Sequence, residues 1–198
     1  MQKRGAFIVI EGLDGSGKTT QARLLVRRLQ SSHNAVYTTE PSRGKIGSFI
    51  RKRCLYEEKR LDCVVEALLF AADRVEHVQN EVIPALNEGK LVVSDRYVYS
   101  SLAYQGSAGL DISWIDAINK HALKPDLAIF IDVAPEMVLQ RLNRKKSVME
   151  TLETQKKVRE IYLKFVANGQ LVRIDGDMPV ADLSEALYTR VLRFLATF

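Results

Sequence analysis

Cysteine, histidine and long apolar runs are scarce in this sequence of 198 residues. The two cysteines, Cys54 and Cys63, lack the close spacing of a metal site, and the three histidines form no cluster. No apolar run approaches the length of a membrane span, and an expected strand at residues 6–10 leaves no room for a signal peptide. These absences argue against a disulfide scaffold, a zinc module and a membrane protein. We expect a cytoplasmic chain with reduced thiols.

Positive charge exceeds negative charge, with a formal net charge of +5 at pH 7. The basic residues are scattered, with small groups at 51–53, 141–146 and 156–159. No RNA-binding signature or zinc knuckle accompanies them, so we expect no nucleic-acid partner. A pocket that holds phosphorylated small molecules needs the same excess of positive charge.

Strand and helix patterns alternate along the whole chain. The expected strands are apolar runs at 6–10, 35–39, 91–94, 127–133 and 170–174. The expected helices lie at 20–29, 46–54, 63–88, 98–105, 112–121, 135–142, 151–168 and 180–195. Pro84 indicates a kink or boundary in the longest helix, and Gly89 its end. The order predicts one three-layer α/β domain over residues 1–198, with flanking helices around a five-stranded, mostly parallel sheet.

Residues 12–19 read Gly-Leu-Asp-Gly-Ser-Gly-Lys-Thr, which fills every fixed position of the phosphate-binding P-loop. An apolar strand precedes the loop and a helical pattern follows it, which argues against a chance turn. Backbone N–H groups and the helix N-terminus would bind phosphate oxygens. Lys18 would reach the β- and γ-phosphates, and Thr19 would ligate Mg²⁺. The expected nucleotide-binding residues are Gly12, Leu13, Asp14, Gly15, Ser16, Gly17, Lys18 and Thr19.

A P-loop alone does not separate GTPases, ATPases and kinases. The guanine-binding motif Asn-Lys-x-Asp has a near match in Asn119-Lys120-His121-Ala122, but its aspartate is missing. We therefore interpret these four residues as a solvated helix end.

Asp95 and Arg96 follow directly after the apolar strand at 91–94. Ligands bind at the edge where parallel strands end, so Asp95 would lie beside the P-loop and hold the Mg²⁺ shell. Arg96 would grip a phosphate through its rigid guanidinium. The alternative interpretation is a salt-bridged strand end.

Phe70 and Arg74 are four residues apart on the expected helix at 63–88 and so share one face. Together they offer a stacking surface and a hydrogen-bonding fork for a planar base. The alternative is that Phe70 belongs to the core, with Leu68 and Leu69 beside it, which we expect to be buried.

A basic segment, 141–146, separates two expected helices. Such a run is often a solvated helix end. In a P-loop kinase it would instead form a lid over the phosphates.

With these residues the chain closely resembles the thymidylate kinases, which phosphorylate dTMP with ATP. The resemblance covers nearly the full length, and its most specific stretch runs from Asp95 to Gly106. The other matching segments are 10–21, Glu40-Pro41, 69–74, 124–127, 131–133 and 157–162. The resemblance implies a P-loop kinase fold, ATP as phosphoryl donor with Mg²⁺, dTMP as acceptor, and a homodimer.

The resemblance also implies roles in binding dTMP. Asp14 would contact the deoxyribose 3′-hydroxyl and orient Arg96, which would bridge the acceptor phosphate and the transferred group. Phe70 would stack on thymine, and Arg74 would hydrogen-bond to it. The pocket for base and sugar would be lined by Ser101 and Tyr104, and either Arg43 or Arg51 would clamp the dTMP phosphate.

On the donor side, Arg141 would cover the adenine ring at the start of a lid at about 141–150. Gly15 replaces the basic residue that some relatives carry in the P-loop, so the lid would supply the catalytic charge through Arg144, with Lys145 beside it. Thr39 stands where many relatives have an arginine before Glu-Pro, which weakens the transfer of any role to that position.

Two other functions stay open on the residues alone. One is a related kinase that uses dCMP, UMP or a deoxynucleoside. The other is a non-catalytic P-loop protein that senses nucleotides or binds nucleic acid. No general base is expected for a kinase here, because a phosphate monoester with a second pKa of about 6 is already nucleophilic at neutral pH.

Overall fold

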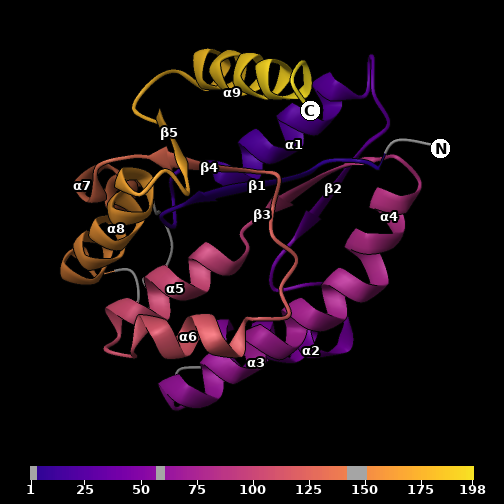
Figure 1. Ribbon diagram of the computed structural model, residues 1–198. Helices are drawn as coiled ribbons and strands as arrows, with labels where there is room; N and C mark the ends of the chain where they lie inside the picture. Colours follow the sequence, from indigo (N-terminus) through magenta and orange to yellow (C-terminus); the bar gives the residue numbers. More distant parts are fainter. Residues whose placement is uncertain (1–3, 57–60, 142–150) are drawn as a thin grey trace.

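The computed structural model describes residues 4–56, 61–141 and 151–198 (Figure 1). A five-stranded sheet runs through the molecule in the order β2-β3-β1-β4-β5. Its strands are β1 (Phe7–Gly12), β2 (Ala35–Thr39), β3 (Leu91–Asp95), β4 (Leu127–Asp132) and β5 (Val172–Asp175). Every neighbouring pair is parallel, so the predicted α/β fold is confirmed and the sheet is parallel throughout.

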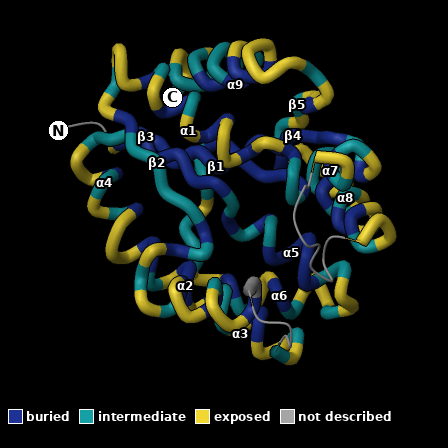
Figure 2. The backbone as a smooth tube through the Cα atoms, turned by 180° about the vertical axis from the view of Figure 1, so that it is seen from behind, coloured by how far each residue is buried: buried dark blue, intermediate teal, exposed yellow. Residues whose placement is uncertain are grey.

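The three central strands are buried along their whole length, and the two edge strands are less so (Figure 2). The central strands are the near-continuous apolar runs that a sheet covered on both faces requires. The last strand begins two residues later than the predicted start at 170, because only the register from Val172 pairs with β4.

Helices cover both faces of the sheet. They are α1 (Lys18–Leu29), α2 (Lys45–Ile50), α3 (Cys63–His77), α4 (Ile83–Asn87), α5 (Val98–Ser107), α6 (Ile112–Ile118), α7 (Pro135–Arg141), α8 (Leu152–Ala167) and α9 (Val180–Leu195). Figure 1 shows α1 and α9 together on one side, with α4, α5 and α8 on the other and α3 and α6 farther out. None of the helices in the described residues is long and apolar enough to cross a lipid bilayer.

The segment predicted as one helix from 63 to 88 is interrupted. A π-helical stretch, η2 (Val78–Val82), separates α3 from α4, and Pro84 lies one residue after α4 begins. Proline has no N–H to donate, so the helical hydrogen bonds widen in the turn before it. Pro84 therefore marks a boundary, and Gly89 stands beyond α4 with a φ of 76°. The predicted helix at 46–54 likewise changes into a π-helical stretch, η1 (Arg51–Tyr56).

Two further predictions about individual residues were wrong. Leu68, predicted to be buried, is 47% exposed, because the buried face of α3 is formed by other residues, Ala67, Ala71 and Arg74 among them. The helix predicted to reach residue 121 ends at Ile118. Asn119, which we interpreted as solvated, is buried.

The sheet places the P-loop next to the Asp95 segment. The strands β1 and β3 are neighbours, with Ile10 opposite Asp95. Both strands run in the same direction, so the loops after them emerge side by side at the same edge of the sheet. This edge contains the candidate site.

Candidate active site

The P-loop connects β1 to α1. Gly15 and Gly17 have φ angles of 88° and 87°, in the left-handed region that favours glycine. These two residues let the backbone curl so that its N–H groups can surround an anion. Gly17 is also the N-cap of α1, and no side chain caps the N–H groups of that first turn. The loop and helix end therefore form a phosphate-binding cradle.

Lys18 lies inside this cradle. Its Nζ donates to the carbonyl of Leu13 at 3.0 Å and lies 3.7 Å from Oδ1 of Asp14. Burial, together with the nearby Arg96 guanidinium, lowers the pKa of Lys18, while the carboxylates of Asp14, Asp95 and Glu11 oppose that shift. A buried cation held beside the loop is placed to neutralise phosphate charge.

Thr19 and Asp95 come together across the loop. The Thr19 hydroxyl donates to Oδ2 of Asp95 at 2.5 Å, and the Tyr37 hydroxyl lies 3.4 Å from the same oxygen. The other carboxylate oxygen of Asp95 is buried and has no hydrogen-bond partner within the part of the chain that the structure describes. A hydroxyl and a carboxylate are oxygen ligands of the kind Mg²⁺ prefers. Among the described residues, no group of three or more His, Cys, Asp or Glu side chains is arranged so that it could hold a metal ion, so phosphates and water would complete a magnesium shell.

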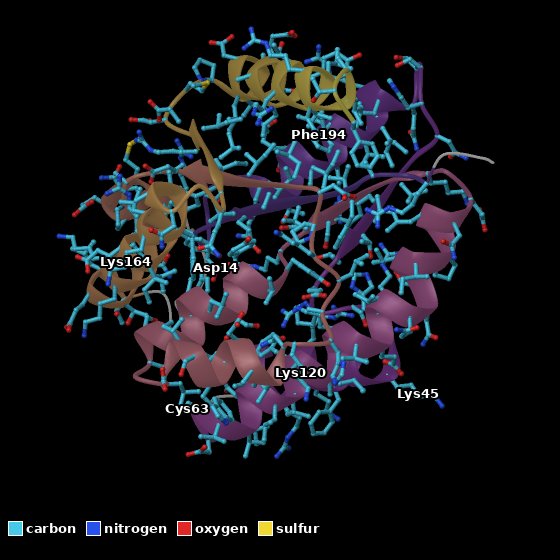
Figure 3. All side chains as sticks on the ribbon, viewed as in Figure 1. Asp14, Lys45, Cys63, Lys120, Lys164 and Phe194 are labelled. Atoms are coloured by element: carbon cyan, nitrogen blue, oxygen red, sulfur yellow. The ribbon has the colours of Figure 1, made fainter. Side chains whose placement is uncertain are left out.

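Arg96, Asp14 and Tyr104 form a second cluster, at the start of α5. Figure 3 shows Asp14 between the sheet and this helix. Arg96 Nη2 donates to Oδ1 of Asp14 at 2.5 Å, and its guanidinium lies 5.1 Å from the centre of the Tyr104 ring. The Tyr104 hydroxyl accepts from the Asp14 N–H at 3.0 Å and contacts Oδ2 at 3.3 Å. Burial alone would raise the pKa of Asp14, but Arg96 and Lys18 hold it well below its usual range.

Arg74, on α3, is the centre of a third cluster, formed with side chains from α5 and from the segments that follow β2 and α6. Its Nε donates to Oε2 of Glu40 at 2.9 Å, and Nη2 lies 2.7 Å from the same oxygen. Nη2 also donates to the Ser101 hydroxyl at 3.1 Å, and Nη1 donates to Oδ1 of Asn119. Phe70, one turn earlier on α3, is half-buried and outside the buried core. The structure thus brings Phe70, Arg74 and Ser101 to one region.

The remaining predicted residues are three arginines in the described part of the chain and the residues of the expected lid. Arg51 donates to the carbonyls of Pro41 and Ser42, on the loop that carries Glu40. Arg43 is exposed. Arg141, also exposed, lies 3.8 Å from Asp177. The expected lid residues Arg144 and Lys145 lie outside the described residues.

Two residues of the site were missed from the sequence. Glu11 is fully buried beside Arg96, and burial raises its pKa to about 7 against the hydrogen bonds that it accepts. A carboxylate near the end of an otherwise apolar strand is a signal that could have found it. Asn119 gave no such signal, because its partner Arg74 is far away in the sequence.

Known proteins were compared with this chain. Residues 10–187 match the family model described as "Thymidylate kinase". A "Probable thymidylate kinase" from Pyrococcus horikoshii is 46% identical over 179 residues, which cover 86% of this chain and 87% of the relative. Another from Pyrobaculum aerophilum is 43% identical over 196 residues, covering 96% and 99%. The matched range contains the P-loop, Arg74, Arg96 and Asn119.

Proposed function

This chain belongs to the thymidylate kinase family, and from that premise we propose how its residues transfer a phosphoryl group from ATP to dTMP. The enzyme is a phosphotransferase that converts dTMP to dTDP. The transferred group carries dispersed negative charge in the transition state, so positioning and charge neutralisation are the main tasks of the protein. The geometry that carries our proposal is the approach of Arg96 to the P-loop through Asp14, which contacts both Arg96 and Lys18.

On the donor side, the P-loop N–H groups and Lys18 bind the β- and γ-phosphates of ATP. Thr19 and Asp95 would hold Mg²⁺, with Oδ1 of Asp95, which has no hydrogen-bond partner in the described ranges of the chain, as a further available oxygen. The bound ion would neutralise phosphate charge and orient the terminal phosphate. We propose that Arg141 covers the adenine ring, and that Arg144, which lies outside the described residues, supplies positive charge to the transferred group as part of a lid at about 141–150.

On the acceptor side, Arg96 binds the dTMP phosphate in line with the terminal phosphate of ATP. Asp14 orients Arg96 through Oδ1 and offers Oδ2, which has only a 3.3 Å contact with Tyr104, to the 3′-hydroxyl. The Tyr104 ring lines the sugar pocket. Arg51 is the better candidate than Arg43 for a second phosphate contact, because it is already held against the loop at Pro41.

The thymine base binds between Phe70 and the Arg74 cluster. Arginine has five N–H groups, and the hydrogen bonds to Glu40, Ser101 and Asn119 use three of them, while Nη2 also lies 2.7 Å from Oε2 of Glu40 in an ion pair. The remaining N–H on Nη1 is available to a base carbonyl. Glu40 and Asn119 hold the guanidinium rigid, so it can select a base by the position of that carbonyl.

The test of this function is a coupled assay of ADP release with ATP fixed and the nucleoside monophosphates varied. We expect the highest kcat/KM with dTMP. A preference for dCMP or UMP would instead support a related nucleotide kinase. ATP binding without turnover, together with steeply salt-dependent DNA binding, would support a non-catalytic P-loop protein.

We also propose that the enzyme is a cytoplasmic homodimer. Apolar side chains gather on one side of α3, where Val64, Val65, Leu68 and Val75 are 39%, 44%, 47% and 38% exposed. Their spacing keeps them within an arc of roughly 100° around the helix. An apolar stripe of this kind is suited to burial against a second copy of the same helix.

The proposed cytoplasmic location rests on the cysteines, because cysteines without metal-like spacing suit a reducing compartment.

The dimer can be tested with Leu68→Lys in light scattering. We expect this variant to be a monomer, because an unpaired charge would be buried in the interface. Val180→Lys is the matched control, since Val180 is 58% exposed at the start of α9. A Leu68→Lys variant that keeps the wild-type mass would contradict the proposed interface.

A further inference from the structure

Glu11 lies on β1, directly before the P-loop, and its carboxylate is fully buried. Oε1 accepts from the backbone N–H groups of Tyr97 at 2.9 Å and Ser100 at 3.3 Å. Oε2 accepts from the Ser100 hydroxyl at 2.7 Å and the Tyr162 hydroxyl at 3.0 Å. Burying a carboxylate costs free energy unless hydrogen bonds compensate for it. Here the compensating donors are concentrated on the turn that carries Arg96.

The backbone of Arg96 is strained. Its φ of 72° lies in the left-handed region, where a side chain is unfavourable. Its own N–H donates to the carbonyl of Ile10 at 3.0 Å, and its carbonyl accepts from the Ser94 hydroxyl at 2.7 Å. Glu11 holds the next N–H along the chain, that of Tyr97. Such a conformation persists only where several neighbours restrain it, and Glu11 supplies one of these restraints.

The side chain of Arg96 is connected to Glu11 as well. Arg96 Nη1 donates to the Ser100 hydroxyl at 2.8 Å, and that hydroxyl donates onward to Glu11. Asp14 binds the other guanidinium nitrogen, Nη2. The guanidinium is therefore held from two sides, by Asp14 directly and by Glu11 through Ser100.

We infer that Glu11 is a positioning residue for Arg96. Glu11 sets both the backbone turn at Arg96 and the direction from which the Arg96 guanidinium meets the acceptor phosphate. This inference rests on the proposed role of Arg96. Burial raises the pKa of Glu11 to about 7, so its charge is maintained at a cost in stability near neutral pH. A protonated carboxyl would give up an acceptor position that these four donors use. The carboxylate thus serves the geometry of Arg96.

The experiment compares binding of dTMP with binding of thymidine, which lacks the phosphate, by calorimetry. Glu11→Gln is expected to weaken dTMP binding and to lower kcat, each by about tenfold, because a charge-assisted restraint on Arg96 is lost. Affinities for thymidine and ATP should change less than about twofold. Tyr99→Phe is the control. It removes a hydroxyl from the same helix, and among the described residues this hydroxyl has its hydrogen bond to the carbonyl of Gln170, at 3.4 Å, and none to Glu11 or Arg96.

Arg96→Lys separates this inference from the proposed function. If Arg96→Lys loses no phosphate-dependent affinity, the proposed role of Arg96 is wrong. If Arg96→Lys loses the phosphate-dependent affinity and Glu11→Gln keeps it, the positioning role of Glu11 is wrong. The role is also wrong if Glu11→Gln weakens the binding of thymidine as much as the binding of dTMP. Should Glu11→Gln fail to fold, Ser100→Ala tests the same connection, and unchanged dTMP binding in that variant would overturn the inference.

Discussion

Asp14→Asn removes the charge that two cations share at the centre of the site. The substitution keeps the size of the side chain, which is 30% exposed and therefore open to a substrate. In the wild type, Oδ1 lies 2.5 Å from Arg96 and 3.7 Å from Lys18. With asparagine, Arg96 loses its ionic partner and faces Lys18 without an intervening negative charge. The larger effect falls on Arg96, the group proposed to hold the acceptor phosphate, because its contact with Asp14 is the shorter of the two.

The size of the effect follows from the Arg96 contact. A hydrogen bond to a charged group contributes about 1.5–3 kcal/mol. We expect Asp14→Asn to lower kcat/KM for dTMP by roughly 30- to 150-fold, which corresponds to about 2–3 kcal/mol. The Kd for ATP should change much less, because Asp14 is proposed to serve the acceptor. Asp116→Asn, an isosteric change at an exposed position of α6, is the control.

The assay measures kcat/KM for dTMP and for its 3′-deoxy analogue. The wild type should prefer dTMP, since Oδ2 of Asp14 is proposed to accept from the 3′-hydroxyl. Asp14→Asn should lose most of that preference. If the variant keeps both the wild-type rate and the preference for dTMP, Asp14 is only a loop residue and the reasoning about the sugar is refuted.

Three further outcomes are expected. Phe70→Ala should raise KM for dTMP about fivefold or more and leave KM for ATP nearly unchanged, because stacking on an aromatic ring contributes roughly 1–3 kcal/mol per base. Normal dTMP affinity in the folded fraction would contradict the proposed stacking of Phe70 on thymine. Arg144→Ala should lower kcat more than Arg141→Ala does, and Arg141→Ala should chiefly weaken ATP binding. A double variant of Arg144→Ala and Lys145→Ala with near wild-type kcat would exclude a catalytic lid. The pKa of Glu11 is raised from 4.5 to about 7, so wild-type stability should fall relative to Glu11→Gln as pH rises through this window, by roughly 3 kcal/mol at most. Denaturant titrations in which the free energy of unfolding shows no such pH trend would contradict the raised pKa of Glu11.

Local patterns were sufficient to predict most of the fold. Apolar strands bounded by turns and a glycine-rich loop are contiguous in sequence, so β1, β3 and β4 were expected close to their observed positions. The π-helical stretches depend on small differences in hydrogen-bond register, which apolar spacing does not record. Leu68 shows another limit, because an apolar residue can lie on an exposed face that only the assembled helices define.

The residues of the site likewise differ in whether local sequence patterns predict them. Lys18, Thr19 and Arg96 stand in contiguous motifs, and the structure brings them to one edge of the sheet. Asn119 could not be found by spacing, since its contact with Arg74 forms only when α3 and α6 pack together. The incomplete guanine-binding motif that begins at Asn119 predicts a solvated helix end, whereas the structure buries this amide.

The parallel pairing of β1 with β3 has a consequence for how this enzyme can change its substrate. The two phosphate-binding loops extend from neighbouring central strands, with Ile10 opposite Asp95, so their separation is determined by the core of the sheet. Arg74 and its partners come instead from α3, from α5 and from the segments that follow β2 and α6. Base preference can therefore evolve or be engineered by exchanging helix side chains, while the geometry of phosphoryl transfer is inherited unchanged from the sheet.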